Sequence, residues 1–329
     1  MKQNTGSCPI NSFLSYIIIW ILIWIGICIL AYKGRCSMDY LLVCNTGSDT
    51  ISKISLKDYS VKKIDLGFFQ RSLGPSGIYL ENNILYTANS YSNTVSIVNL
   101  NSFKEESSLY VGAHPNDLIK SDNCLYVACS ESNVLAVYDL NEKRIILDIA
   151  INCWPHNMEI KKDEKLIFVS NFLSNNVSVI DIQTNKVIGE ISTYEYPTKI
   201  KISKDNKYLY VCESYMGNSL GGYIEIFDLT TSKAVSKIKV GKEPMDIVET
   251  MEELYVCNFG EGTISIINRK LYKEVKKIYV GGMPKAILKE KDMLIILDYL
   301  QGRVIILNLV EGSRKAITVG KEPNAMTLY

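Results

Sequence analysis

The sequence predicts an all-β fold. We expect a seven-bladed β-propeller of four-stranded antiparallel blades, closed by the C-terminal strand and preceded by one N-terminal transmembrane helix. Three observations support this prediction: an apolar motif recurs seven times, seven prolines recur with it, and the strands are apolar on both faces. Each repeat is about forty residues long, which is enough for four short strands and their turns.

The first element is a run of twenty residues without a charge, at positions 13–32. A helix of this length spans about 30 Å, the thickness of the hydrocarbon core of a bilayer. We therefore expect a short tail at 1–12, a transmembrane signal anchor at 13–32, a linker at 33–39 and the propeller at 40–329. A cleaved signal peptide is the alternative, but its apolar stretch is usually only about 7–15 residues long.

The charges around this segment leave its orientation open. Lys2 flanks one end, Lys33 and Arg35 flank the other, and the positive-inside rule does not choose between such similar counts. An N-terminal helix followed by one domain usually exports that domain, so we expect a single-pass membrane protein with an extracytoplasmic propeller. The nine cysteines, an odd number without metal-site spacing, argue mildly for the other side.

The recurring apolar motif, as in "LYVCN", predicts the second strand of each blade, which we call strand B. A short polar turn and an alternating strand C follow each copy. The motif begins at Leu41, Leu85, Leu125, Ile167, Leu209, Leu254 and Leu294.

The prolines predict the first strand of each blade, strand A. Proline has no backbone N–H donor and therefore favours the first position of a strand. An apolar residue follows each of these prolines three places later, and a "VG" pair before several of them marks the end of strand D. The seven are Pro75, Pro115, Pro155, Pro197, Pro244, Pro284 and Pro323.

The two ends of the repeat region predict how the ring closes. The region opens with a strand B near Leu41 and ends with a lone strand A, Pro323–Tyr329. We expect this last strand to complete the first blade. Strands such as "KLIFVS" are apolar on both faces, which suits blades that pack between two neighbours.

The repeats resemble a known type. The stretch "LYVCN…GTISIIN" from Leu254 and "NSYSNTVSIVNL" from Asn89 are similar to the YVTN family of propeller repeats, found in surface-layer-type proteins and YncE-like seven-bladed propellers. The resemblance covers residues 40–329 and implies the fold rather than an activity. A WD40 repeat is a poor match, because Trp154 is the only tryptophan outside the N-terminal apolar segment.

Strand direction predicts which loops share a face. Loops that join strand D to A and strand B to C lie on one face, which we call the D–A/B–C face, and the A–B and C–D loops lie on the other. Aromatic and Met side chains anchor many protein interfaces. Residues of these types interrupt the repeat on the D–A/B–C face and are the candidate partner-binding residues: Phe68, Phe69, Trp154, Tyr215 and Met216.

Polar residues next to the strand-A prolines are candidates for the rim of the central channel. These are His114, Asp117, His156, Asn157 and Asp246. Propeller lactonases use a ring of carboxylates and amides to hold a divalent cation, so a lactonase-type hydrolase is one alternative function. The two histidines leave a propeller associated with haem or a redox cofactor as another. Lys199 occupies the same ring and would repel a cation, so we expect neither a metal nor a cofactor.

Composition and motifs favour a non-catalytic role. The net charge is +1, and 22% of the residues are charged, so the chain lacks the basic excess of a nucleic-acid-binding protein. No nucleophile elbow, P-loop or dinucleotide fingerprint is present. We therefore expect a membrane-tethered scaffold that binds a protein or another cell-envelope component and no nucleic acid.

Overall fold

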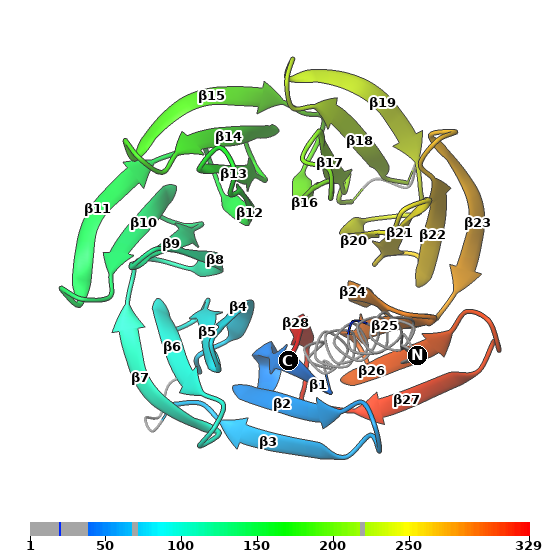
Figure 1. The fold of residues 1–329 in the computed structure, drawn as a ribbon, viewed down its shortest axis with the longest axis horizontal. Coiled ribbons are helices and arrows are strands. Elements are labelled where there is room, and N and C mark those ends of the chain that lie inside the picture. Colours follow the sequence, from blue (N-terminus) through cyan, green and yellow to red (C-terminus); the bar gives the residue numbers. More distant parts are fainter. Residues whose placement is uncertain (1–19, 21–38, 68–71, 218–220) are drawn as a thin grey trace, which may run out of the picture. The chain divides into compact units, whose positions relative to one another are not determined.

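Seven four-stranded antiparallel sheets, the blades, stand around a central opening (Figure 1). The computed structural model describes Trp20 and residues 39–67, 72–217 and 221–329. It divides the chain into residues 1–39 and the propeller unit, residues 40–329. The predicted seven-bladed propeller is confirmed, with the strand order that the repeats indicate.

The predicted transmembrane helix at 13–32 lies outside the described residues, apart from Trp20. The predicted tail and all but the last residue of the linker also lie outside them. Within the part of the chain that the structure describes, no helix is long and apolar enough to cross a membrane. The signal anchor therefore stays a prediction.

Blades 2 to 4 each consist of four consecutive strands, in the order A to D from the centre outward. Blade 2 is β4 (Pro75–Glu81), β5 (Ile84–Asn89), β6 (Thr94–Asn99) and β7 (Lys104–Tyr110). Blade 3 is β8 (Pro115–Ser121), β9 (Cys124–Cys129), β10 (Val134–Asp139) and β11 (Arg144–Ala150). Blade 4 is β12 (Pro155–Lys161), β13 (Leu166–Asn171), β14 (Asn176–Asp181) and β15 (Lys186–Ser192).

Blades 5 to 7 follow the same order. Blade 5 is β16 (Pro197–Ile202), β17 (Tyr208–Glu213), β18 (Tyr223–Asp228) and β19 (Lys233–Lys239). Blade 6 is β20 (Pro244–Glu249), β21 (Glu253–Asn258), β22 (Thr263–Asn268) and β23 (Lys273–Tyr279). Blade 7 is β24 (Pro284–Glu290), β25 (Met293–Asp298), β26 (Arg303–Asn308) and β27 (Arg314–Thr318).

Blade 1 joins the two ends of the propeller, as the sequence predicts. The last strand pairs with the first, so that Leu328 lies opposite Leu41, and Tyr40 and Tyr329 exchange backbone hydrogen bonds of 3.0 and 2.8 Å. A 3-10 turn, η1 (Thr46–Ser48), follows the first strand. The strands of blade 1 are β28 (Pro323–Leu328), β1 (Tyr40–Asn45), β2 (Thr50–Ser55) and β3 (Val61–Asp65).

The hydrophobic core is divided among the seven interfaces between neighbouring blades. Each interface holds one cluster of buried side chains, contributed by both blades. Between blades 6 and 7, for example, Tyr255 and Ile266 pack with Ile287 and Ile296. Because one blade cannot bury both of its apolar faces alone, the burial of apolar surface holds the ring together.

The backbone hydrogen bonds show the two faces that strand direction predicts. On one face, the N–H of Phe172 in a B–C turn donates to the carbonyl of Trp154 in a D–A loop at 2.9 Å. On the other face, the N–H of Leu140 in a C–D turn donates to the carbonyl of Asn123 in an A–B turn at 3.0 Å. Equivalent bonds recur around the ring and fix the loops of each face to one another.

Candidate functional site in the central channel

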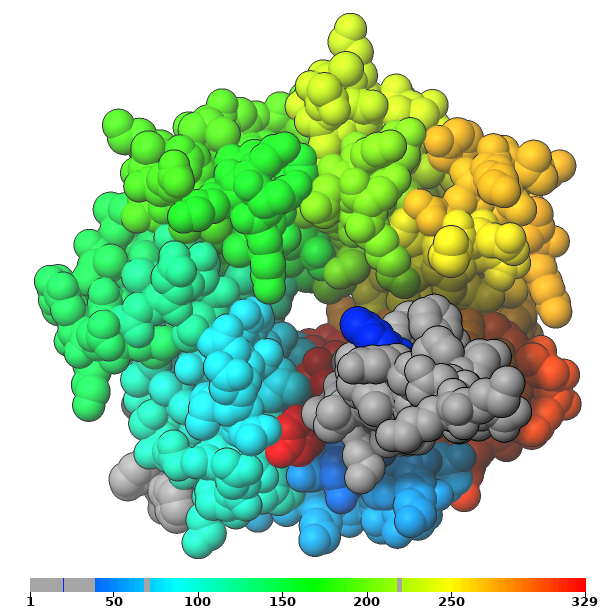
Figure 2. All heavy atoms as spheres, viewed as in Figure 1, coloured from blue at the N-terminus to red at the C-terminus, as the bar shows by residue number. Residues whose placement is uncertain are grey.

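The strands A of the seven blades surround the central channel (Figure 1). An opening is visible at the centre of the ring in Figure 2. The channel contains a cavity of about 210 Å³, lined by residues one to three places after the strand-A prolines. Because each proline follows a D–A loop, this channel cavity lies toward the D–A/B–C face.

Asp117 lies in the channel cavity and connects blades 3 and 4. Its Oδ1 accepts a hydrogen bond from the N–H of Leu118 at 2.9 Å, and its Oδ2 accepts one from the N–H of Met158 at 3.0 Å. The side chain of Asn157 also donates to Oδ2, at 2.6 Å. Both oxygens of this carboxylate are therefore occupied by donors of the protein.

Asp246 connects blades 6 and 7 in the same way. Its Oδ1 accepts from the N–H of Ile247 at 2.9 Å, and its Oδ2 accepts from the N–H of Ile287 at 2.8 Å. Asn157 repeats half of this arrangement, since its Oδ1 accepts from the N–H of Ile200 on blade 5 at 3.1 Å. These three side chains satisfy backbone donors that strand A, as an edge strand, turns toward the channel.

Two lysines lie in the same channel cavity, Lys199 and Lys285. Burial opposes the charge of Lys199, but Asp246 and Asp117 together raise its pKa above the usual lysine value. Burial lowers the pKa of Lys285, although Asp246 acts in the opposite direction. Burial likewise raises the pKa of both aspartates, with Lys199 opposing the shift.

The two histidines have different surroundings. His156 lines the channel cavity, where its Nδ1 lies 3.3 Å from the carbonyl of Thr198. Burial and the nearby Lys285 lower the pKa of His156 to about 3, so the ring is neutral at pH 7. His114 precedes its proline and does not line the cavity; its ring lies 5.6 Å from that of Trp154.

The residues present do not fit the metal site of a lactonase. Among the residues that the structure describes, no three His, Cys, Asp or Glu side chains lie close enough together to hold a metal ion. The oxygens of Asp117 and Asp246 already accept backbone donors, and two ammonium groups share the cavity. A haem fits no better, because the cavity is smaller than the roughly 300–1,000 Å³ of ordinary ligand pockets.

The predicted partner-binding residues differ in exposure. Met216 is 41% exposed. Tyr215 is half-buried, lies against Tyr223 at 5.4 Å and accepts a hydrogen bond from Lys237 at 3.0 Å. Trp154 is half-buried against His114, and both Phe68 and Phe69 lie outside the described residues.

Several residues on the D–A/B–C face and in the channel cavity were not predicted from the sequence. Leu173 and Leu300, in B–C turns, are 53% and 63% exposed on the same face as Met216. Lys285 and Asn324 line the channel cavity. Each directly follows its strand-A proline, as the predicted His156 does.

Glu213 and Glu225 form a buried acidic pair at the base of the longest B–C loop. In blade 6, the equivalent residues are Asn258 and Ser265, and the amide donates to the hydroxyl at 2.8 Å. The two glutamates take these places in blade 5, where the Oε1 of Glu213 accepts the N–H of Tyr194 at 2.9 Å. Burial and the neighbouring carboxyl group of Glu225 raise the pKa of Glu213 to about 9.

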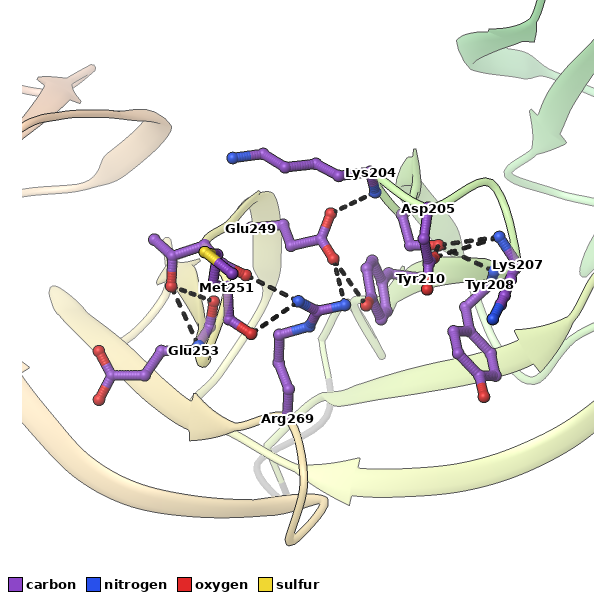
Figure 3. Close-up of polar contacts among 11 residues, drawn as sticks. Lys204, Asp205, Lys207, Tyr208, Tyr210, Glu249, Met251, Glu253 and Arg269 are labelled. Atoms are coloured by element: carbon purple, nitrogen blue, oxygen red, sulfur yellow. Dashed lines mark hydrogen bonds and ion pairs between the residues drawn. The ribbon is translucent and has the colours of Figure 1, made fainter. Parts of the chain in front are cut away.

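A second polar cluster ties blades 5 and 6 together on the opposite face (Figure 3). Arg269 forms an ion pair of 2.5 Å with Glu249 and donates to the carbonyls of Thr250 and Met251, both at 2.9 Å. Glu249 also accepts the hydroxyl of Tyr210 at 3.2 Å. Since Arg269, Glu249 and Tyr210 bond to one another across the two blades, the cluster has a structural role.

Comparisons with solved structures show the same fold at low sequence identity. Hydrazine synthase of Kuenenia stuttgartiensis matches with a TM-score of 0.69 and 20% identity, over 79% of this chain and 91% of that one. A candidate 6-phosphogluconolactonase of Bacteroides fragilis matches with a TM-score of 0.71 and 12% identity, over 89% and 99%. The dihydro-haem d1 dehydrogenase NirN matches with a TM-score of 0.66 and 10% identity, over 88% and 75%.

The sequence, rather than the fold, identifies the family of this chain. No curated protein matches the chain. The family model of the YncE-like β-propeller matches residues 75–252, which is more than half of the chain and spans blades 2 to 5 completely. Together with the seven closed blades, this match shows that the chain belongs to the YncE-like β-propeller family.

Proposed function

We propose that this chain is a non-catalytic binding propeller that receives a protein partner on its D–A/B–C face. The observation that carries the proposal is a set of exposed apolar side chains in the B–C turns of four blades. Three of them occupy the same place, two residues after strand B, and Met216 extends the set into blade 5. The four side chains are Tyr91, Leu173, Met216 and Leu300, between 41% and 63% exposed.

These turns carry apolar side chains at positions where a loop in contact with water would carry polar ones. Apolar and aromatic side chains of this kind gain free energy when a partner covers them. Tyr194, in a neighbouring D–A loop, is 53% exposed on the same face. The channel residues support a binding role as well, since Asp117 and Asp246 use their oxygens to join blades.

Site-specific photo-crosslinking tests this proposal. A photoreactive amino acid at position 173 or 300 should give a discrete adduct of one mass in cells that express the full chain, and protease should degrade the captured partner. Position 251 is the matched control, because Met251 is 88% exposed in an A–B turn on the opposite face. Equal adducts from all three positions, or none from 173 and 300, would contradict the proposal, and a protease-resistant adduct would indicate a non-protein envelope component.

The tether is the second part of the proposal. The uncharged segment at 13–32 is long enough to cross a bilayer. We expect the full chain to stay in the membrane pellet after an alkaline carbonate wash, and a variant without residues 13–32 to be released. Protease digestion of a C-terminal tag in intact cells checks the extracytoplasmic side. Release of the full chain by the carbonate wash would contradict the membrane anchor. Protection of the tag from protease would contradict the extracytoplasmic location.

A lactonase-type hydrolase is the main rival function, and the Bacteroides fragilis structure shares only its fold with this chain. The donor set of the channel does not favour it, because Lys199 and Lys285 lie where a cation would bind. Metal analysis of the purified protein separates the two functions. We expect no stoichiometric divalent cation, whereas one bound cation per chain would favour the hydrolase.

A further inference from the structure

The channel contains a ring of equivalent backbone donors. In each blade, the third residue after the strand-A proline holds the same register against strand B, as Leu118 opposite Val127 does in blade 3. In five blades, a side chain in the channel accepts a hydrogen bond from the N–H of this residue. The five donors are Leu118, Met158, Ile200, Ile247 and Ile287.

The two remaining donors are Met326 in blade 1 and Ile78 in blade 2, which are neighbours. Met326 lies opposite Val43 and Ile78 lies opposite Thr87, the same register as in the other blades. Their N–H groups therefore also face the channel. Within the described ranges, no side chain accepts a hydrogen bond from either of them, because alanine or glycine stands at each position that could supply an acceptor.

The geometry of the two aspartates shows what is missing there. Asp117 and Asp246 each use one oxygen for the N–H of the next residue and the other for the N–H of the neighbouring blade. The equivalent residue before Met326 is Ala325. A carboxylate at this place would join the N–H groups of Met326 and Ile78 in the same way.

We propose that the channel binds a small organic carboxylate, whose two oxygens accept hydrogen bonds from the backbone N–H groups of Met326 and Ile78. The bound group takes the place that an aspartate side chain at position 325 would fill. This inference rests on the channel alone and is independent of the proposed protein partner.

The space at this place is part of the channel cavity. Ile78, Ala325 and Met326 all line that cavity of about 210 Å³. Gly77 cannot fill it from blade 2, because a Cβ at this residue would lie 2.6 Å from the carbonyl oxygen of Asn116. Asn324 also lines the cavity and adds a side-chain donor.

Two lysines line the channel cavity together with Asp117 and Asp246. In the part of the chain that the structure describes, Lys199 and Lys285 have no carboxylate within 4.0 Å. Both ammonium groups are therefore free of close ion pairs within those residues and add positive potential to the cavity that would hold a carboxylate. The flat shape and paired oxygens of a carboxylate match the arrangement that Asp117 already shows, which favours a carboxylate over a phosphate or sulfate.

Acetate is the probe for this site, added to the full chain labelled with 15N at Ile and Met. The amide signals of Met326 and Ile78 should shift and saturate as acetate is added. The amides of Met158 and Ile287 are internal controls, because aspartates already occupy them. No shift of Met326 and Ile78, an equal shift of all four, or a response to phosphate but not to acetate would overturn the proposal.

Two substitutions at one position complete the test. Ala325→Asp supplies the carboxylate from the chain, so it should raise the melting temperature and weaken acetate binding by at least about tenfold. Ala325→Leu fills the space without an acceptor, so it should abolish the acetate response without raising the melting temperature. If Ala325→Asp binds acetate as the unchanged protein does, the site is not at position 325.

Discussion

Single residues determine how each blade joins its strand B to the neighbouring segments. In blades 1, 2, 4 and 6, the last residue of strand B is an asparagine whose amide donates to a strand-C hydroxyl, as Asn45 does to Ser52 at 2.9 Å. In blade 5, Glu213 and Glu225 replace this neutral pair with two carboxyl groups. The burial of an acidic pair makes the protonation of Glu213 part of the folding equilibrium.

We predict that the stability of the propeller falls as the pH rises from about 6.5 to about 9. In this range, the unfolded chain has released the Glu213 proton, whose ordinary pKa is 4.5, while the folded chain keeps it because the folded pKa is about 9. The folded state then binds more protons, so the free energy of unfolding decreases by up to ~1.4 kcal/mol per pH unit. Urea unfolding at several pH values measures this slope. Between about pH 4.5 and 6.5 the buried neutral His156 opposes this trend, because its folded pKa of about 3 lies below the ordinary value of 6.5.

The matched control is the double variant Glu213→Asn with Glu225→Ser, which restores the pair found in blade 6. Its free energy of unfolding should be less dependent on pH than that of the unchanged protein. Lys237 lies 3.7 Å from Glu213 and stays in both proteins, so the comparison isolates the two carboxyl groups. Identical slopes for both proteins would show that Glu213 does not hold its proton.

Positions counted from the strand-A prolines predict three channel residues that line the cavity: Asp117, Asn157 and Asp246. The roles of their oxygens could not be predicted, because their partners are backbone N–H groups about forty residues away, as for Asp117 and Met158. His114 was expected on the channel rim. It lies outside the cavity lining, since a residue before the proline belongs to the D–A loop.

At the scale of elements, the strands follow closely from the sequence. Strand B carries the apolar motif, and proline marks the start of strand A, so both could be located from the chain alone. The C-terminal strand β28 was predicted to complete blade 1, and its pairing with β1 confirms this. The contacts of Tyr215 and Met216, in the long loop of blade 5, could not be predicted from the sequence, because this loop has no counterpart of equal length in the other repeats.

We predict that removal of residues 323–329 destabilises the whole propeller, since β28 pairs with β1 and contributes Met326 to the core shared with blade 7. The truncated chain should lose cooperative unfolding, measured by thermal circular dichroism. A circular permutant of 40–329 is the control. In this permutant, an inserted Asn-Asn dipeptide, copied from the A–B turn of blade 2, joins Tyr329 to Tyr40. The new chain ends lie between Gly112 and Ala113.

The permutant keeps the pairing of β28 with β1 and changes only the connection, so it should melt close to the unchanged propeller. If the truncated chain instead melted within about two degrees of the full one, β28 would not be needed for closure. If the permutant and the truncated chain lost stability equally, the cause would be the changed chain connectivity and not the missing strand.

The complete ring has seven similar interfaces between neighbouring blades and one central channel. The interfaces account for the apolar residues on both faces of each blade. In the channel, carboxylates hold neighbouring blades where a metal-dependent propeller would hold a cation. We therefore conclude that Asp117 and Asp246 act as connectors between blades, and we propose that the space at Ala325 is open to a ligand.

The substitution Asp117→Ala tests this claim most directly. It leaves the N–H groups of Leu118 and Met158 and the amide of Asn157 without their acceptor, so we expect a loss of about 2–4 kcal/mol and a melting temperature lower by roughly 3–7 °C. Sodium acetate should restore part of this loss, and calcium chloride at equal ionic strength should not. An unchanged melting temperature in Asp117→Ala, or a calcium-dependent rise in the unchanged protein that this substitution removes, would contradict the account.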